Sequence, residues 1–132
     1  MTNKLPISLY DGAYGLMIRM YACDQEGLTS LHHLFRALAV GELQRIDFAQ
    51  DSRFSLEGLR SLILESVKIQ PRKALKIGPG PSGPTARWSN TPDEWLESAD
   101  KTENLLHATD PGHQYLTTEG VDDALILLSY ME

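Results

Sequence analysis

The sequence has little that supports covalent chemistry or a membrane location. It contains one cysteine in 132 residues, Cys23, so no internal disulfide can form. No apolar run approaches the ~20 residues that cross a bilayer, and the longest, residues 124–128, is only as long as a strand. The first residues also lack the apolar core of a signal peptide. We therefore expect a cytoplasmic protein with no membrane partner.

Basic residues are scarce in the last third of the chain. Residues 88–132 carry ten acidic side chains and one basic one, Lys101, whereas residues 45–87 carry eight basic and four acidic side chains. The formal net charge of the whole chain is −6. Such an excess repels a polyanion, so we expect no nucleic-acid partner despite the small basic group formed by Arg72, Lys73, Lys76 and Arg87.

Metal and nucleotide motifs are missing as well. His32 and His33 are adjacent in a predicted helix, where neighbouring side chains point about 100° apart, so one ion cannot bind both easily. The chain contains no His-Glu-x-x-His and no paired Cys-x-x-Cys. "GPGPSG" lacks the Lys-Ser/Thr of a P-loop, and its prolines remove amides that would bind phosphate. We expect no metal and no cofactor.

The first third predicts a hairpin and a helix. Residues 6–22 read as two strands around a turn at Asp11-Gly12, and the second strand is apolar on both faces, as expected for an interior strand covered on both sides. A helix then begins at the N-cap Asp24 and ends at Gly41. Its predicted buried stripe comprises Leu28, Leu31, Leu34, Phe35 and Leu38. A short alternating strand follows at residues 43–49.

The middle of the chain is harder to assign. Residues 54–69 fit either a helix or a strand, but Gly58 disfavours a long helix, and we favour a strand from about Arg60 to Ile69. Residues 78–84 are rich in glycine and proline, which predicts a flexible loop. Because segments typical of strands flank this loop, it can be the tip of a long hairpin.

A second helix is predicted from "NTPDEW". Thr91 is the N-cap, Pro92 the first helical residue, and Glu94 completes a capping box. The helix should run to about His107, with a buried stripe of Trp95, Ala99, Thr102 and Leu106. On its other side Asp93, Glu97, Asp100 and Asn104 recur at spacings of 4, 3 and 4 residues, which places them on one face.

The last segment predicts a closing hairpin. "HQYLT" and "DALILLSYM" are strands separated by residues 118–122, with Gly120 at the bend, and the second is apolar enough to be central. Asp122 and Asp123 are expected to keep the entrance of that strand solvated. The whole chain, residues 1–132, therefore predicts a single α+β domain: a mostly antiparallel sheet with two main helices packed on it.

Our first hypothesis for function is a non-enzymatic protein-binding module. A solvated helix face is the ordinary explanation of the acidic residues, and a docking surface for a basic protein is the alternative. The residues expected to bind are Asp93, Glu97 and Asp100, with Trp88 as an aromatic anchor if it is exposed. By analogy alone, small acidic α+β proteins without cofactors include many bacterial immunity proteins, which mask the basic active site of a toxin.

Two other hypotheses stay open. A small enzyme or ligand-binding domain would use Cys23, His113 or Tyr115 in a pocket between sheet and helices, and Asp110 and Glu119 could assist His113 in acid–base chemistry. No family signature surrounds these residues, so the sequence favours a protein that is not an enzyme. The third hypothesis is a structural protein that forms a homo-oligomer through an exposed sheet edge.

Overall fold

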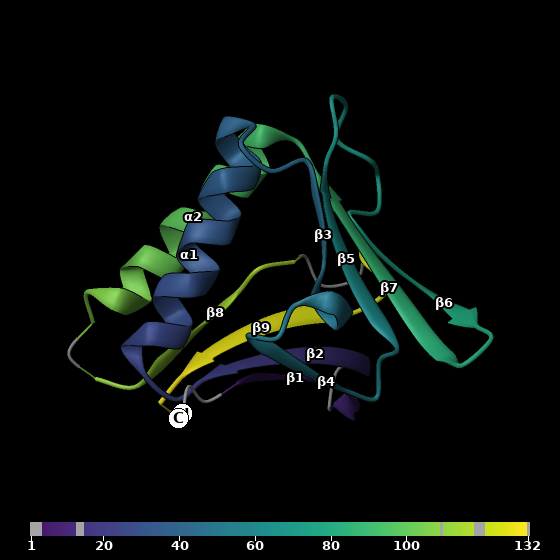
Figure 1. Ribbon diagram of the computed structural model, residues 1–132, viewed down its shortest axis with the longest axis horizontal. Coiled ribbons are helices and arrows are strands. Elements are labelled where there is room, and N and C mark those ends of the chain that lie inside the picture. Colours follow the sequence, from purple (N-terminus) through teal and green to yellow (C-terminus); the bar gives the residue numbers. More distant parts are fainter. Residues whose placement is uncertain (1–3, 13–14, 109, 118–120, 132) are drawn as a thin grey trace.

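The protein is built from two β-sheets and two α-helices (Figure 1). The computed structural model describes residues 4–12, 15–108, 110–117 and 121–131. The first sheet has the strand order β4 (Phe54–Glu57), β1 (Leu5–Gly12), β2 (Gly15–Ala22), β9 (Leu125–Tyr130) and β8 (Gly112–Tyr115). The second has the order β3 (Arg45–Asp47), β5 (Ser61–Ser66), β7 (Gly83–Asn90) and β6 (Leu75–Gly80). The helices are α1 (Gln25–Val40) and α2 (Pro92–Leu106), with a 3-10 turn η1 (Phe48–Gln50) after β3.

The α+β class is confirmed, but the expected single sheet is two mixed sheets. Strand β1 pairs with β4, β2 with β9, and β5 with β7 in parallel, while the remaining pairs, among them the closing hairpin of β8 and β9, are antiparallel. A parallel pair needs a crossover connection, and here each joins strands that are not consecutive in the chain. The alternation of polar and apolar residues within one segment indicates a strand, but it does not show which distant strand pairs with it.

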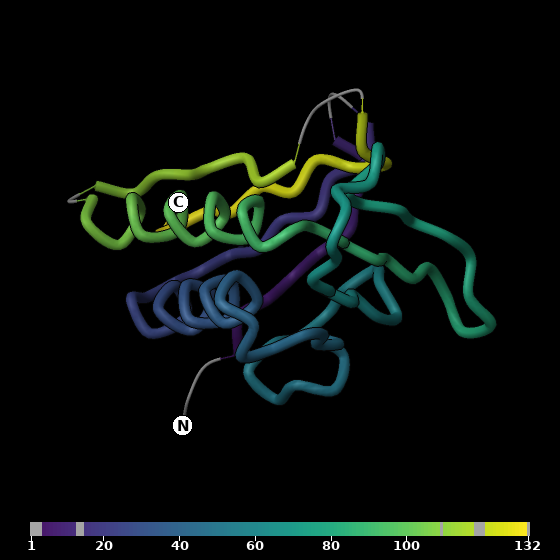
Figure 2. The backbone as a smooth tube through the Cα atoms, turned by 90° about the horizontal axis from the view of Figure 1, so that it is seen from above, coloured from purple at the N-terminus to yellow at the C-terminus, as the bar shows by residue number. Residues whose placement is uncertain are grey.

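The hydrophobic core lies where the helices and the two sheets meet. Both helices cover one face of the first sheet, and the second sheet stands beside them (Figure 1). From above, α1 and α2 lie side by side, and the hairpin of β6 and β7 extends away from them (Figure 2). The other face of the first sheet carries no helix or sheet from the described ranges. Strand β2 is therefore interior as expected, but its second face is covered less: Ile18 and Met20 are buried, whereas on the other face Met17 is buried and Arg19 and Tyr21 are only half-buried.

Helix α1 follows its sequence prediction closely. The Asp24 carboxylate accepts a hydrogen bond from the Gly27 amide at 2.9 Å, as an N-cap does. Gly41 ends the helix at φ 83°, in the left-handed region that favours glycine. All five residues of the predicted stripe are buried: Leu28, Leu31, Leu34, Phe35 and Leu38.

The segment that could have been a helix or a strand forms two strands and no helix. Strand β5 lies within the predicted range of residues 60–69, and β4 precedes it. Gly58 stands between them at φ 80°, and a Cβ at this position would lie 2.7 Å from the Leu9 carbonyl oxygen. Only glycine fits this close approach, so the residue that disfavoured a helix also marks the turn.

The glycine- and proline-rich segment is a hairpin, as its flanks suggested, but the loop is shorter than residues 78–84. Strand β6 continues to Gly80 and β7 begins at Gly83, which leaves Pro81 and Ser82 at the tip. Pro79 and Pro84 face each other across the two strands. Proline is tolerated at strand ends because few ladder hydrogen bonds are lost there.

Three aromatic rings join α1, α2 and the second sheet. Phe35 of α1, Trp88 of β7 and Trp95 of α2 are completely buried, with ring centroids 4.8 to 5.9 Å apart. The Trp95 indole N–H also donates to the Glu65 carbonyl of β5 at 3.1 Å. Each ring comes from a different element, so this contact fixes the position of both helices against the sheet.

Asp122 and Asp123 do not keep a strand entrance solvated; that prediction is wrong. The Asp122 carboxylate accepts hydrogen bonds from the amides of Ala74 and Leu75 at 2.7 and 3.0 Å. The Asp123 carboxylate accepts one from the Ile77 amide at 2.8 Å. These amides lie on the free edge of β6, and backbone groups there require partners. The two carboxylates therefore tie the segment before β9 to the second sheet.

Trp88→Ala should lower the free energy of unfolding by about 3–5 kcal/mol, because the substitution opens a cavity at the junction of three elements. Urea denaturation followed by far-UV circular dichroism measures this loss. Leu96→Ala is the matched control, because Leu96 is 39% exposed. Full burial of a leucine side chain contributes at least about 1.5 kcal/mol, so truncation of Leu96 should cost well under this value. Equal losses in the two variants would contradict the structural role of the aromatic contact.

Asp123→Asn should weaken the protein at neutral pH and reduce its acid sensitivity. The Lys73 ammonium at 2.8 Å and the Ile77 amide hold the pKa of the Asp123 carboxyl below its ordinary value. As the pH falls, the Asp123 carboxyl is therefore protonated in the unfolded chain before it is protonated in the folded protein. The contribution of the Asp123 carboxylate to the free energy of unfolding is thus present above about pH 4 and is lost as the pH falls through the pKa of the folded state. We expect a loss of about 1–2 kcal/mol at pH 7 and a shallower decline in acid.

Thermal unfolding from pH 7 to pH 3 tests this expectation. Asp110→Asn is the control, since it makes the same substitution at an exposed aspartate and should change the stability at pH 7 by less than about 0.5 kcal/mol. A parallel profile for Asp123→Asn and the native protein would rule out the proposed contribution.

Candidate functional site

The surface that the sequence predicts to bind a partner is the outward side of α2. Asp93, Glu97, Asp100 and Asn104, here called the acidic face, are all exposed and lie on one side of this helix. The buried side is formed by Trp95, Ser98, Ala99, Thr102 and Leu105, so Leu105 takes the place expected for Leu106, which is half-buried. The helix ends at Leu106, one residue before the predicted end.

Most carboxylates of α2 are not neutralised. Glu97 pairs with Lys101 at 3.7 Å, and Glu103 lies 3.9 and 3.6 Å from His32 and His107. Within the part of the chain that the structure describes, Asp93, Glu94 and Asp100 form no ion pair. A negative potential therefore remains over the acidic face.

The start of α2 is capped differently from the prediction. Thr91 occupies the N-cap position and Pro92 the first turn, but the Thr91 side chain forms no capping hydrogen bond. The Thr91 amide donates instead to the Gln70 side-chain oxygen at 2.9 Å. The capping box with Glu94 is therefore wrong, because a residue more than twenty positions upstream supplies the acceptor. Glu94 stays exposed and without a structural task at the helix start.

Trp88 cannot be an aromatic anchor, because its side chain is 0% exposed. On β7 it stands beside Leu64 of β5 and Leu75 of β6, and it packs in the aromatic contact of the core. The alternation of "TARWS" left open which face of the strand is buried. The exposed apolar side chain on α2 is Leu96.

A small cleft lies beside the acidic face. Its volume is 250 Å³. Four of its residues belong to α2, and the others come from the segment before β6, from the end of β7 and from both sides of the closing hairpin: Gln70, Pro71, Arg72, Ala74, Asn90, Glu94, Glu97, Ser98, Lys101, Leu116, Thr117, Val121 and Asp122. Ser98 and Asn90 are polar side chains that are nevertheless buried. The cleft combines exposed carboxylates with polar groups deeper in the fold.

The residues of the enzyme hypothesis lie away from this cleft. The rings of His113 and Tyr115 are 5.8 Å apart on β8, and Cys23 is exposed just after β2, with β9 lying between these two strands. All three are absent from the residues that line the cleft beside α2. Glu119 and Gly120 lie outside the described residues. The structure brings His113 and Tyr115 together as exposed residues of β8, and β9 separates them from the strand that precedes Cys23.

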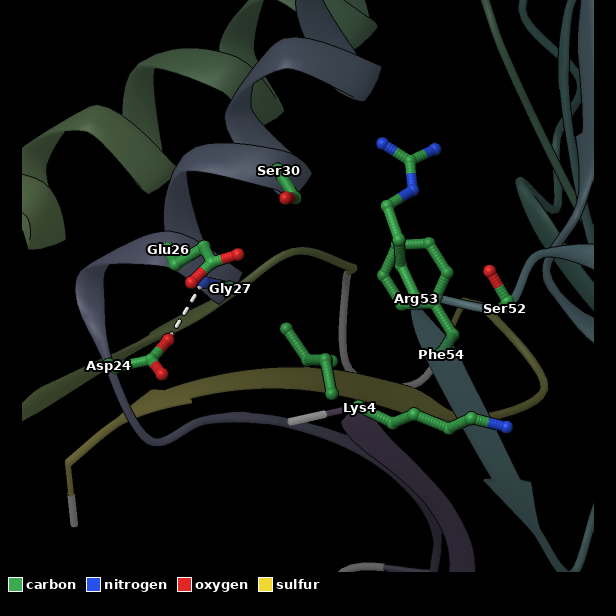
Figure 3. A pocket seen from close by; sticks show the side chains of 9 residues that line it. Lys4, Asp24, Glu26, Gly27, Ser30, Ser52, Arg53 and Phe54 are labelled. Carbon is green, nitrogen blue, oxygen red and sulfur yellow. Dashed lines mark hydrogen bonds between the residues drawn. The ribbon is translucent and has the colours of Figure 1, made fainter. Parts of the chain in front are cut away.

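A second cleft, of 310 Å³, lies at the start of α1 (Figure 3). Asp24, which lines it, caps the helix through the Gly27 amide, so a carboxylate already occupies the positive end of the helix dipole. Arg53 lines it too, but its guanidinium pairs with Asp51 at 2.6 Å. The described lining residues include no histidine or cysteine. No serine that lines this cleft forms a hydrogen bond to a base among the described residues, and Lys4 is its one cation without an ion pair there.

Glu94→Gln should change the free energy of unfolding by less than about 0.5 kcal/mol, since Glu94 does not cap the helix. Gln70→Ala removes the actual acceptor of the Thr91 amide and should cost about 0.5–1 kcal/mol. Urea denaturation of the two variants distinguishes the capping box from the observed cap. If Glu94→Gln lowered the free energy of unfolding more than Gln70→Ala, the capping box would be the correct description of this helix start.

Known proteins offer no identification. Among the described residues no three histidine, cysteine, aspartate or glutamate side chains gather to hold a metal ion, and no helix there is long and apolar enough to cross a membrane. The chain matches no model of a known protein family, no curated protein and no solved structure.

Proposed function

We propose that this chain is a non-enzymatic protein-binding module that docks a basic protein through the acidic face of α2. One observation carries the proposal. Asp93, Glu97 and Asp100 project from one exposed helix face, and Lys101 is the one cation of α2 among them. A complementary positive surface would be attracted by this potential, which raises the rate of encounter and favours specific partners.

The rigidity of α2 supports the same proposal. Trp95 anchors the helix in the core, and α2 lies along α1 (Figure 2). The backbone of such a fixed element loses little freedom on binding, so less of the interaction energy is spent on ordering it. Leu96 adds an exposed apolar contact on the same helix.

We further propose that the partner is a toxin with a basic active-site surface and that this protein is of the immunity type. Nucleases, for example, bind a polyanion, and an acidic face can compete for the same surface. Cytoplasmic action fits this role. The free thiol of Cys23 is exposed, which is typical of proteins in a reducing compartment.

A homo-oligomer formed through the edge of β6 or of β8 is less favoured. Asp122 and Asp123 occupy amides on the free edge of β6. Lys101 donates to the Tyr115 carbonyl of the edge strand β8 at 2.9 Å. Side chains that occupy edge groups prevent the pairing of another strand.

A charge-reversal variant tests the proposed function. Asp93→Lys, Glu97→Lys and Asp100→Lys together should weaken a complex captured from the native host by at least about tenfold, because attraction becomes repulsion. The complex of the native protein should also weaken as salt rises. Affinity capture at low and moderate salt, followed by mass spectrometry, identifies the partner, and titration of that partner measures the loss.

The matched control reverses three exposed carboxylates elsewhere, at Glu26, Glu42 and Glu57. This triple variant undergoes the same change of net charge and should bind normally. Equal weakening in both triple variants would mean that net charge, and not the acidic face, governs binding. Normal binding by the α2 variant would refute the proposal.

A further inference from the structure

We infer that the open face of the first sheet is a second interaction surface, which binds an amphipathic helix of a partner protein through the Arg19 guanidinium. The open face is the side of β4, β1, β2, β9 and β8 that is turned away from α1 and α2 (Figure 1). No helix or strand of the described ranges covers it. The inference goes beyond the proposed function, because α2 lies on the opposite side of this sheet.

The strand register places Arg19 at the centre of the open face. Strand β2 is the middle strand of the five. Ile18 and Met20 of β2 are buried on the helix side, so Arg19 between them points to the open face, because side chains alternate along a strand. Paired residues share a face, which puts Ser8 of β1 on one side of Arg19 and Leu127 of β9 on the other.

The Arg19 side chain is held in place but has no counter-ion. Its Nε donates to the Ser129 hydroxyl at 3.2 Å, and its guanidinium carbon lies 4.8 Å from the centre of the Tyr21 ring. Within the described ranges Arg19 forms no ion pair. Glu57 of β4 stands in the same row, but two strand spacings, roughly 10 Å, separate the two residues. The remaining guanidinium donors therefore suit a carboxylate of another molecule, which such a planar group binds by two parallel hydrogen bonds.

The residues around Arg19 have the composition of a protein interface. Tyr10 of β1 and Tyr115 of β8 are 39% and 43% exposed, and Leu127 is half-buried. Aromatic residues and arginine are enriched in interfaces between proteins. Met17 and Leu125 also belong to this face but are already buried, so the apolar contact would come mainly from the two tyrosines and Leu127.

The spacing of the two exposed tyrosines suits one helix. Strands β1 and β8, which carry them, are three strand spacings apart, or roughly 14 Å. An α-helix with its side chains is about 10–12 Å wide, so one helix would lie over β2 and β9 with a tyrosine on each side. A carboxylate in the apolar stripe of this helix would meet Arg19. Helices of the chain already cover the other face (Figure 1), and helices on both faces are a stable arrangement for a sheet.

A second copy of this chain fits the open face less well. Two copies stacked about the middle strand would bring their Arg19 guanidinium groups together, where like charges repel. A shift that pairs Arg19 with Glu57 of the other copy centres the contact on β1 and leaves β8, with Tyr115, outside it. Single-stranded nucleic acid stacks on tyrosines as well, but a net charge of −6 repels it.

Nuclear magnetic resonance titration of the ¹⁵N-labelled protein with two peptides tests the inference. Each is an amphipathic peptide of alanine, leucine and glutamine, about 18 residues long so that a helix can form. One peptide carries a glutamate at the centre of its apolar stripe, and the other carries glutamine there. Amide shifts should concentrate on β2, β8 and β9. The glutamate peptide should bind about tenfold more tightly, because hydrogen bonds between charged groups are the stronger ones.

Three variants show whether Arg19 is the group that recognises the glutamate. Arg19→Gln should abolish the difference between the two peptides, as expected when one partner of a coupled pair is removed. Tyr115→Ala should weaken both peptides about threefold, since it removes an aromatic contact and no charge. Arg45→Gln removes an exposed cation of β3 in the second sheet and should change neither affinity.

Several outcomes would overturn the inference. One is a difference between the peptides that persists in Arg19→Gln, and another is a set of shifts confined to the helices. A native dimer in sedimentation that Tyr115→Ala dissociates would assign the open face to a second copy. Tighter binding of oligothymidylate than of the glutamate peptide on the same strands would assign it to nucleic acid.

Two further measurements keep these results distinct. Thermal unfolding shows whether the variants are folded, and if Arg19→Gln is not, the comparison of the two peptides on the native protein and on Tyr115→Ala still decides. The variant with Asp93→Lys, Glu97→Lys and Asp100→Lys should keep the tenfold preference for the glutamate peptide. Failure of the proposed function would therefore leave this inference standing, and the reverse holds as well.

Discussion

The contact between Phe35, Trp88 and Trp95 determines where everything else in this protein lies. These rings belong to α1, β7 and α2, and each is completely buried. Because aromatic rings bury large areas and prefer defined orientations, the contact sets how α2 lies against the second sheet. The acidic face and the neighbouring cleft both depend on that placement. A tryptophan that seemed available for binding thus acts from the interior, by holding the binding element in position.

The acidic residues of the chain divide into two groups by their neighbours. Asp24 and Asp122 are used by the backbone, the first at a helix start and the second at a strand edge. Asp93 and Asp100, by contrast, project from α2 into solvent. Surface charges without a partner of opposite sign slightly destabilise a compact protein through repulsion. Asp93 and Asp100 therefore lower the stability of the folded protein unless a binding partner neutralises them. Net charge alone does not separate these groups.

The parts that the sequence predicted are those decided by neighbours along the chain. The periodicity of α1, its Asp24 cap and its Gly41 end depend on residues within a few turns of each other, and all were confirmed. The parts that it missed depend on distant segments: the Gln70 acceptor at Thr91, and the carboxylate of Asp122 at β6. The cleft shares this origin, because its lining comes from several separate stretches. Ser98, which lines this cleft between Glu97 and Ala99 of the sequence, carried no signal there.

The position of β9 has a consequence for how the chain acquires its structure during synthesis. Residues 125–130 form a strand between β2 and β8, and β2 lies more than one hundred positions upstream. Until these residues leave the ribosome, β2 is an edge with unsatisfied backbone groups, and β6 lacks the segment that covers it. Sheets closed by such distant strands fold slowly and expose surfaces prone to aggregation meanwhile. This nascent chain should therefore depend on chaperones more than its small size suggests.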